Sequence, residues 1–173
     1  MNLIITCARH LEPETEEEII KILEGFGDSD VKVSITQMSG ILIAETALKP
    51  IQVVRQIREM VLDEPWSVRY CLRIIPIQNY VETKVEEIEK IVTKMSKQVL
   101  EGETYRISIK KRNSDLSSSE LISKIASKIT NKVSLEFPDK IILIEILGNV
   151  TGISILKQSD ILSLEKTKRS ISE

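Results

Sequence analysis

The chain has 173 residues, of which 42% are hydrophobic, 29% charged and only 3% aromatic, and its formal net charge is -2. This composition indicates a soluble globular protein of one domain or two small ones, with a core of Ile, Leu and Val. It excludes a wholly basic nucleic-acid binder, and no apolar run reaches the roughly 20 residues needed to cross a bilayer.

The start of the chain and its cysteines predict a cytoplasmic location. "MNLIITCARH" is short and strand-like, and lacks the basic leader and small-residue cleavage site of a signal peptide. Cys7 and Cys71 lie far apart in strand-like segments, so we expect buried, reduced thiols rather than a disulfide.

Residues 1–78 are predicted to form a ferredoxin-like domain. The pattern is strand, helix, strand, strand, helix, strand, in which two helices cover one face of a four-stranded antiparallel sheet. Proline at positions 13 and 50 marks the two helix starts, and Ser39-Gly40 marks the hairpin turn. The expected elements are a strand at 2–8, a helix from Pro13, the strands "DVKVSITQ" and "GILIAETA", a helix from Pro50 and the strand "VRYCLRIIPI".

Residues 79–159 are predicted to form a second α/β domain, followed by a polar tail at 160–173. "QNYVET" reads as a linker, and "KIILIEIL" is apolar enough for a central strand. The tail is expected to hold one helical turn and to fray at its end. The other expected elements are helices at 83–99 and 117–130, a strand at 104–111, and the strands "KVSLEF" and "TGISIL".

The residue types that catalysis requires are scarce. His10 is the single histidine, and its isolated position favours a surface or loop role over catalysis. We find no Cys/His spacing for a metal and no glycine-rich phosphate loop, and the acidic runs are typical of solvated helix faces. Trp66, beside Pro65, is interpreted as a structural plug in preference to a base-stacking platform. We therefore expect no catalytic residue, metal or cofactor.

The cations concentrate in residues 104–132, which hold seven Lys and Arg against two acids. In "YRISIKKR", Arg106, Ser108 and Lys110 alternate with apolar residues, so one face of the strand is cationic. Ser117 and Glu120 fit a capping box at a helix start, whose free N–H groups favour phosphate oxygens. An ordinary capped helix with a solvated lysine face explains the same residues, and both interpretations stay open.

The segment "YRISIKKRNSDLSSSELISKIASKI" resembles the core signature of THUMP domains, in which a cationic strand is followed by a polar loop and an amphipathic helix. "IILIEILGNVTGISIL" is similar to the hairpin that follows, and "YCLRIIPIQNYVETKVEEI" is similar to the junction that precedes it. The resemblance covers about residues 70–157. It implies an α/β fold in which a ferredoxin-like part precedes the THUMP domain.

The resemblance also implies binding of tRNA at its acceptor end, near the 3′-CCA. It is closest to free-standing THUMP proteins that act as non-catalytic adaptors for the RNA cytidine acetyltransferase, which forms N4-acetylcytidine. The residues expected to contact RNA are Arg106, Lys110, Lys111, Arg112, Ser117, Ser118, Ser119, Lys124 and Lys128. Two alternatives remain: a subunit that completes the site of another tRNA-modifying enzyme, such as a thiouridine synthetase or methyltransferase, and a ferredoxin-like sensor of a small molecule.

Overall fold

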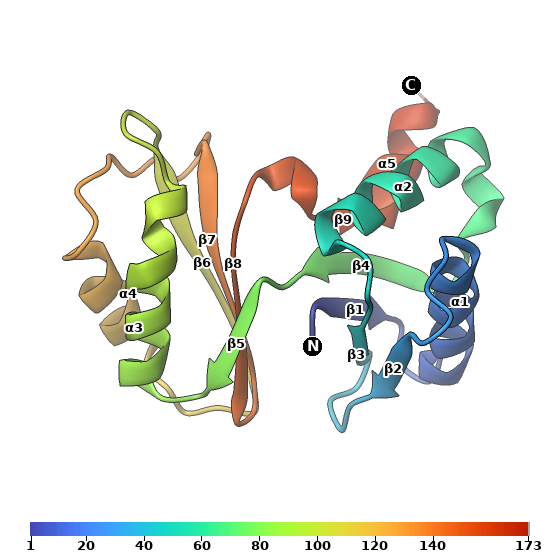
Figure 1. The fold of residues 1–173 in the computed structure, drawn as a ribbon, viewed down its shortest axis with the longest axis horizontal. Helices are drawn as coiled ribbons and strands as arrows, with labels where there is room; N and C mark the ends of the chain where they lie inside the picture. The colour runs from blue at the N-terminus through green and yellow to red at the C-terminus, as the bar shows by residue number, and fades with distance from the viewer. Residues whose placement is uncertain (173) are drawn as a thin grey trace. The chain divides into compact units, whose positions relative to one another are not determined.

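The computed structural model describes residues 1–172, which form two compact units (Figure 1). Unit 1 consists of residues 1–77 and the segment from Ser159 onward, and unit 2 consists of Gln78–Gln158. The elements in chain order are β1 (Leu3–Cys7), α1 (Glu12–Gly25), β2 (Lys32–Ile35), β3 (Ile41–Glu45), α2 (Pro50–Asp63), η1 (Pro65–Ser67), β4 (Cys71–Pro76), β5 (Asn79–Glu82), α3 (Val85–Met95), η2 (Ser96–Gln98), β6 (Tyr105–Arg112), α4 (Ser118–Ala126), β7 (Lys140–Leu147), β8 (Val150–Leu156), η3 (Gln158–Asp160), β9 (Leu162–Ser163) and α5 (Leu164–Ile171).

Unit 1 contains an antiparallel sheet in the order β2-β3-β1-β4-β9. The helices α1 and α2 supply Leu23 and Val54, among others, to a core shared with β1, β3 and β4. The first four strands thus have the order of the predicted ferredoxin-like βαββαβ fold. Cys7 and Cys71 face each other on β1 and β4 as free, buried thiols, as expected.

The turn between β2 and β3 requires a glycine at position 40. Gly40 has φ of +75°, and a Cβ atom built there would lie 2.6 Å from the carbonyl oxygen of Cys7. Its N–H donates to the Glu12 carboxylate at the start of α1, at 2.8 Å. This hydrogen bond is the main reason that the pKa of Glu12 lies below its ordinary value. The Glu12 carboxylate therefore holds the hairpin against α1.

The C-terminal segment departs from the prediction of a frayed polar end. β9 pairs with β4, and α5 packs against α2, with Leu162 and Leu164 buried in the core of unit 1. Arg58 on α2 also donates to the carbonyl oxygen of Ser159 at 2.6 Å. Because only two apolar residues attach this segment, its hydrophobic pattern is too weak to reveal the helix.

Trp66 does not form the structural plug that we expected. It lies in η1, and 72% of its surface is exposed. The neighbouring core position is filled by the buried Val68 instead, so the Pro65–Ser67 turn directs the indole toward solvent.

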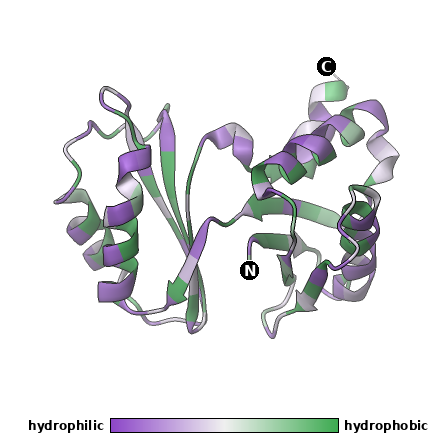
Figure 2. Ribbon diagram, viewed as in Figure 1, coloured by the Kyte–Doolittle hydropathy of each residue, from purple (hydrophilic) through white to green (hydrophobic). Residues whose placement is uncertain are grey.

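Unit 2 contains a sheet in the order β5-β8-β7-β6, in which β6 and β7 are parallel and the other pairs antiparallel. The helices α3 and α4 cover one face of this sheet (Figure 1). β7 is central, as its continuous apolar sequence predicted (Figure 2), and all residues of β7 and β8 except the first of each strand are buried.

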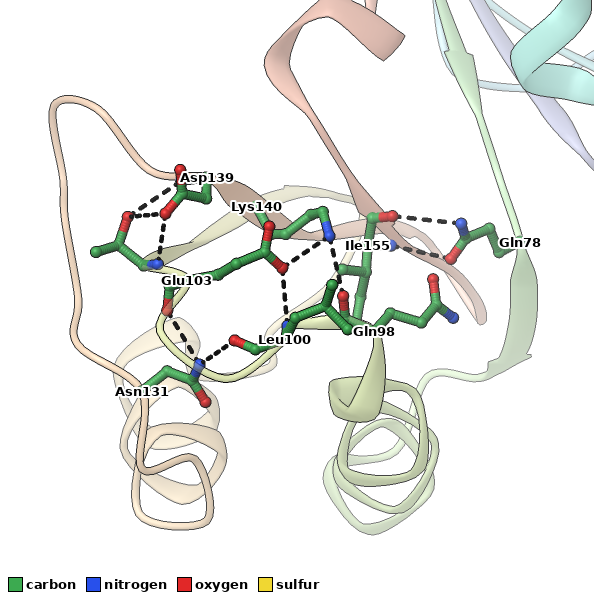
Figure 3. Close-up of polar contacts among 9 residues, drawn as sticks. Gln78, Gln98, Leu100, Glu103, Asn131, Asp139, Lys140 and Ile155 are labelled. Atoms are coloured by element: carbon green, nitrogen blue, oxygen red, sulfur yellow. Dashed lines mark hydrogen bonds and ion pairs between the residues drawn. The ribbon is translucent and has the colours of Figure 1, made fainter.

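Two segments of unit 2 differ from the prediction. "QNYVET" is not a linker, because Asn79–Glu82 form the edge strand β5 on β8. Just before it, the Gln78 side chain exchanges two hydrogen bonds with the backbone of Ile155, at 3.0 and 3.3 Å (Figure 3). "KVSLEF" is not a strand beyond a single bridge from Val133 to Tyr105. The expected helices at 83–99 and 117–130 also end earlier, at Met95 and Ala126.

Within residues 1–172, we find no helix long and apolar enough to span a membrane.

Candidate nucleic-acid interface

The register of β6 divides the predicted cations between the two faces of the sheet. Tyr105, Ile107 and Ile109 pack into the core under α3 and α4, and Lys111 follows on the same face by alternation. Arg106, Lys110 and Arg112 alternate with them and therefore lie on the opposite face. β6 does not present its cations as one continuous surface.

Lys111 and the start of α4 lie together at one corner of unit 2. Ser117 is the N-cap of α4, and its Oγ accepts the N–H of Glu120 at 3.3 Å and lies 3.2 Å from the Oγ of Ser119. The Nζ of Lys111 donates to the carbonyl oxygen of Leu116 at 2.8 Å, directly before the cap. The predicted cap is confirmed, and a lysine ammonium lies one residue from an exposed helix start.

Three other predicted cations already contact acids. Arg112 lies 3.4 Å from the carboxylate of Glu145, a residue only 1% exposed. Lys124 pairs with Glu120 on the same helix at 3.5 Å, so the second half of the expected capping box is not formed.

Lys128 reaches across to Glu89 on α3 at 2.7 Å. This hydrogen bond is the main reason that the pKa of Glu89 lies below its ordinary value. Lys128, like Arg112 and Lys124, has its charge compensated within unit 2.

Arg106 and Lys111 differ from these three because their described hydrogen bonds go to neutral oxygens. The guanidinium of Arg106 donates to the carbonyl oxygen of Leu135 at 3.1 Å and to the side-chain oxygen of Gln158 at 3.2 Å. Its buried Nε has no hydrogen-bond partner among the described residues. Both cations keep a charge that no acid within ion-pair distance compensates in the described part of the chain, so both can attract phosphate.

The nine predicted residues therefore do not form one cluster. Lys111 lies with Ser117, Ser118 and Ser119 at the start of α4. Arg106 lies five residues earlier on β6, about 16 Å away at the usual rise of a strand. Lys124 and Lys128 follow α4 away from the cap, since the crossover helix between parallel strands runs back along the sheet.

The sequence analysis did not predict a polar network at one end of unit 2 (Figure 3). We call this end, formed by residues 98–104, 130–132 and 139–140, the base of unit 2. Lys140 donates to Glu103 at 2.9 Å and to the carbonyl oxygen of Gln98 at 3.0 Å, and Asn131 donates to the carbonyl oxygens of Leu100 and Glu103. A hollow of about 650 Å³ beside this network is lined by residues of the 101–104 and 130–132 segments. These residues lie on separate loops, and no local sequence motif joins them.

Two of the acids at this base have lowered pKa values. The N–H of Leu100 and then Lys140 hold the pKa of Glu103 below its ordinary value of 4.5. Asp139 accepts the backbone N–H of Thr104 at 2.8 Å, and this bond holds the pKa of Asp139 below 3.8. Both carboxylates are thus stabilised in their charged forms.

A comparison with protein families identifies one part of the chain. Residues 82–156 match the family model of the THUMP domain. Unit 2 is a THUMP domain. The match includes β6, the cap of α4 and the β7–β8 hairpin, the segments in which the sequence resembles the family.

A curated relative and several solved structures are similar to the chain. The uncharacterized protein MJ0421 of Methanocaldococcus jannaschii is 30% identical over 106 residues, which is 58% of this chain and 29% of that protein. The crystal structure of PH1313 from Pyrococcus horikoshii is 20% identical with a TM-score of 0.63, over 91% of this chain and 55% of that one. This chain therefore spans less than two thirds of either relative.

Two further structures share the fold at lower identity. A 4-thiouridine synthetase in complex with RNA and ATP is 14% identical with a TM-score of 0.58, over 94% of this chain and 42% of that chain. TrmN from Thermus thermophilus is 11% identical with a TM-score of 0.54, over 90% and 45%. At these identities the similarity establishes the fold alone.

Proposed function

We propose that this chain binds tRNA through its THUMP domain and performs no chemistry of its own. The observation that carries the proposal is the match of residues 82–156 to a domain family whose fold occurs in a synthetase solved with RNA. Two cations of the domain support the proposal, because Arg106 and Lys111 contact neutral oxygens and can therefore bind phosphates. By contrast, Arg112 and Lys128 already contact acids.

The proposed phosphate contact is the corner formed by Lys111 and the start of α4. A phosphate there would accept from the Lys111 ammonium, the Ser117 hydroxyl and the free N–H groups of Ser118 and Ser119. Lys110 and Arg106 would contact the strand of RNA that continues past the edge of β6. Lys124, Lys128 and Arg112 contribute less, because each would have to leave or share an acid partner.

We further propose that the bound part is the acceptor end with its 3′-CCA, and that the chain presents tRNA to the RNA cytidine acetyltransferase. A second candidate is presentation to a methyltransferase or thiouridine synthetase. The similarity in fold to TrmN and to a 4-thiouridine synthetase supports this candidate. In each of those proteins the shared region is less than half of the chain, so it occurs there together with further residues.

The binding proposal predicts a strong dependence on salt. The affinity of the protein for unmodified tRNA, measured between 50 and 200 mM salt, should fall steeply because phosphate contacts release counterions. Lys111→Glu should lower the affinity at least about tenfold, since it loses one phosphate contact and adds a repulsive charge. Lys94→Glu, an equal charge change at an exposed position of α3, is the matched control and should have a much smaller effect.

Arg112→Glu is unsuitable for this test, because it would place a second carboxylate beside the buried Glu145. Salt-insensitive binding, or equal losses from the two lysine variants, would contradict the proposed site. The partner is tested separately by adding the chain to purified acetyltransferase, acetyl-CoA and tRNA. Acetylation should need both proteins, and modification by this chain alone would contradict a non-catalytic role.

A further inference from the structure

The segment between α4 and β7 exposes three large apolar side chains, of which Val133 is the least exposed at 55%. Leu135 is 74% exposed and Phe137 is 79% exposed, in a chain with only two phenylalanines. The other phenylalanine, Phe26, packs against the core of unit 1. We call residues 133–138 the apolar loop. Burial of Phe137 against a ligand would remove its apolar surface from water, and this would add a favourable hydrophobic term to the free energy of binding.

Hydrogen bonds fix both ends of the apolar loop to the start of β6. The backbone N–H of Tyr105 donates to the carbonyl oxygen of Lys132 at 3.0 Å, and the carbonyl oxygen of Tyr105 accepts from the N–H of Ser134 at 2.9 Å. At the other end, Asp139 and Thr104 exchange backbone and side-chain hydrogen bonds between 2.8 and 3.2 Å (Figure 3).

The tip of the loop is also constrained. The N–H of Phe137 donates to the Oγ of Ser134 at 3.2 Å, and Pro138 fixes the backbone that follows. The exposed side chains are therefore presented from an ordered backbone, which lowers the entropy lost when a ligand binds.

The charges beside the loop favour a nucleic-acid strand as the occupant. Arg106 donates directly to the carbonyl oxygen of Leu135, and its charge is not compensated by an acid within ion-pair distance among the described residues. Lys132, exposed just before the loop, adds a second cation; of the acids nearby, Asp139 accepts the N–H of Thr104 and Glu103 contacts Lys140, while Glu136 lies in the loop. An exposed aromatic side chain two residues from the carbonyl that this guanidinium contacts matches a base followed by its phosphate.

A polar hollow adjoins the base of the same loop. It is lined by Lys132 and Thr104, which hold the loop ends, and by Glu101, Glu103 and Asn131. Carboxylate and amide groups of this kind accept and donate hydrogen bonds to ribose hydroxyls and base edges. A strand whose base stacks on the loop could place a neighbouring nucleotide in this hollow.

We propose that the apolar loop is a stacking subsite for unpaired nucleotides, in which Phe137 packs against a base and Arg106 contacts the adjoining phosphate. The inference rests on the proposed function and identifies which part of the RNA reaches this end of the domain. It assigns the single-stranded 3′ end to the apolar loop and the paired stem to the Lys111 corner.

The test uses the full chain and two RNA hairpins with the same acceptor stem. One ends in a four-nucleotide single strand, and the other is blunt. Phe137→Ala should weaken binding of the first at least about fivefold, the loss of one stacked base, and should leave binding of the blunt hairpin unchanged. Phe137→Trp should keep the affinity, and Leu62→Ala, at an exposed apolar position of α2, should change neither. Circular dichroism and the melting temperature check that each variant is folded.

The outcomes separate the subsite from the proposed function. Equal weakening of both hairpins by Phe137→Ala, or no weakening of either, overturns the stacking subsite while RNA binding stands. If the wild-type chain binds neither hairpin nor tRNA, both proposals are overturned. Loss of self-association in the Phe137→Ala variant, with RNA affinity unchanged, would make the loop a contact between protein copies and also overturns the subsite.

Discussion

At the scale of single residues, the partner of a cation decides what the cation can do. Arg112 and Arg106 lie on the same strand and the same face, yet Arg112 contacts a buried carboxylate and Arg106 contacts neutral oxygens. Sequence alternation assigned Arg106 to this face, although the expected strand ended at residue 111 and β6 extends to Arg112. It could not predict their different partners, because Glu145 and Leu135 lie more than 25 residues away along the chain.

Loss of the Arg112 side chain should destabilise the THUMP domain. Arg112→Met removes one partner of the Glu145 carboxylate, which is 1% exposed, so the free energy of unfolding should fall by about 1–3 kcal/mol. Urea unfolding followed by circular dichroism measures the change, with the exposed Lys94→Met as the control. Equal stability of the two variants would show that Arg112 is not a structural cation.

At the scale of elements, loops far apart in sequence are joined by acids that accept backbone N–H groups. Glu18 on α1 accepts the N–H groups of Arg69, Tyr70 and Cys71, at 2.8 to 3.2 Å. Asp139 acts in the same way at the base of the THUMP domain, where it accepts the N–H of Thr104, 35 residues away along the chain. These acids are as much a part of the fold as the apolar core.

The acids at the base of the THUMP domain predict a dependence of stability on pH. The pKa values of Asp139 and Glu103 are lower in the folded than in the unfolded chain. Their stabilisation is therefore complete above the unfolded values and is lost as the pH falls through the folded ones. The double variant Asp139→Asn with Glu103→Gln should melt at a lower temperature than wild type at pH 7, and the gap should narrow as the pH is lowered.

Calorimetric melting at a series of pH values measures this effect. Glu101→Gln, a change at an exposed acid two residues from Glu103, is the control and should melt like wild type throughout. A gap between the double variant and wild type that is independent of pH would show that the two carboxylates stabilise the base without titrating.

Most elements followed from local sequence, and the exceptions share a physical cause. Helix starts at Pro13 and Pro50, the Gly40 turn and the central strand β7 are set by backbone geometry and hydrophobic pattern. β5, β9 and α5 were missed because distant pairing, rather than local hydrophobicity, holds them in place. The apolar residues of "KVSLEF" predicted a strand by composition, but only Val133 finds a partner strand.

The candidate site was predicted in part for the same reason. The cap at Ser117 and its neighbour Lys111 are local in sequence, and the structure brings them together. The pairing of Lys128 with Glu89 depends on how α3 packs on α4, which the lysine spacing does not encode. The exposure of Phe137 depends on the anchoring of the apolar loop to Tyr105 and Thr104, which no motif records.

At the scale of the whole molecule, the chain leaves unit 1 after Ile77 and returns to it at Ser159. β9 and α5 then complete the sheet and core that residues 1–77 begin. Removal of α5 should therefore expose apolar surface on α2 and β4 and destabilise unit 1, while the THUMP domain keeps its core.

A variant that ends at Ser163 tests this expectation. Amide hydrogen exchange should become faster in β1, β3 and β4, and should stay unchanged in β7 and β8. Lys168→Met, which removes only the hydrogen bond from α5 to the carbonyl oxygen of Val68, provides a milder comparison. Uniformly faster exchange in both units would contradict separate cores.

The return of the chain has a consequence for synthesis on the ribosome. Residues 78–158 are synthesised before the last strand and helix of unit 1, so unit 1 cannot complete its core until the whole THUMP domain has been made. The Leu162 and Leu164 positions of that core stay empty until the segment that follows residue 158 is added. Until then unit 1 exposes the apolar surface of β4 and α2 that β9 and α5 cover, and chaperones that bind apolar surface would recognise it.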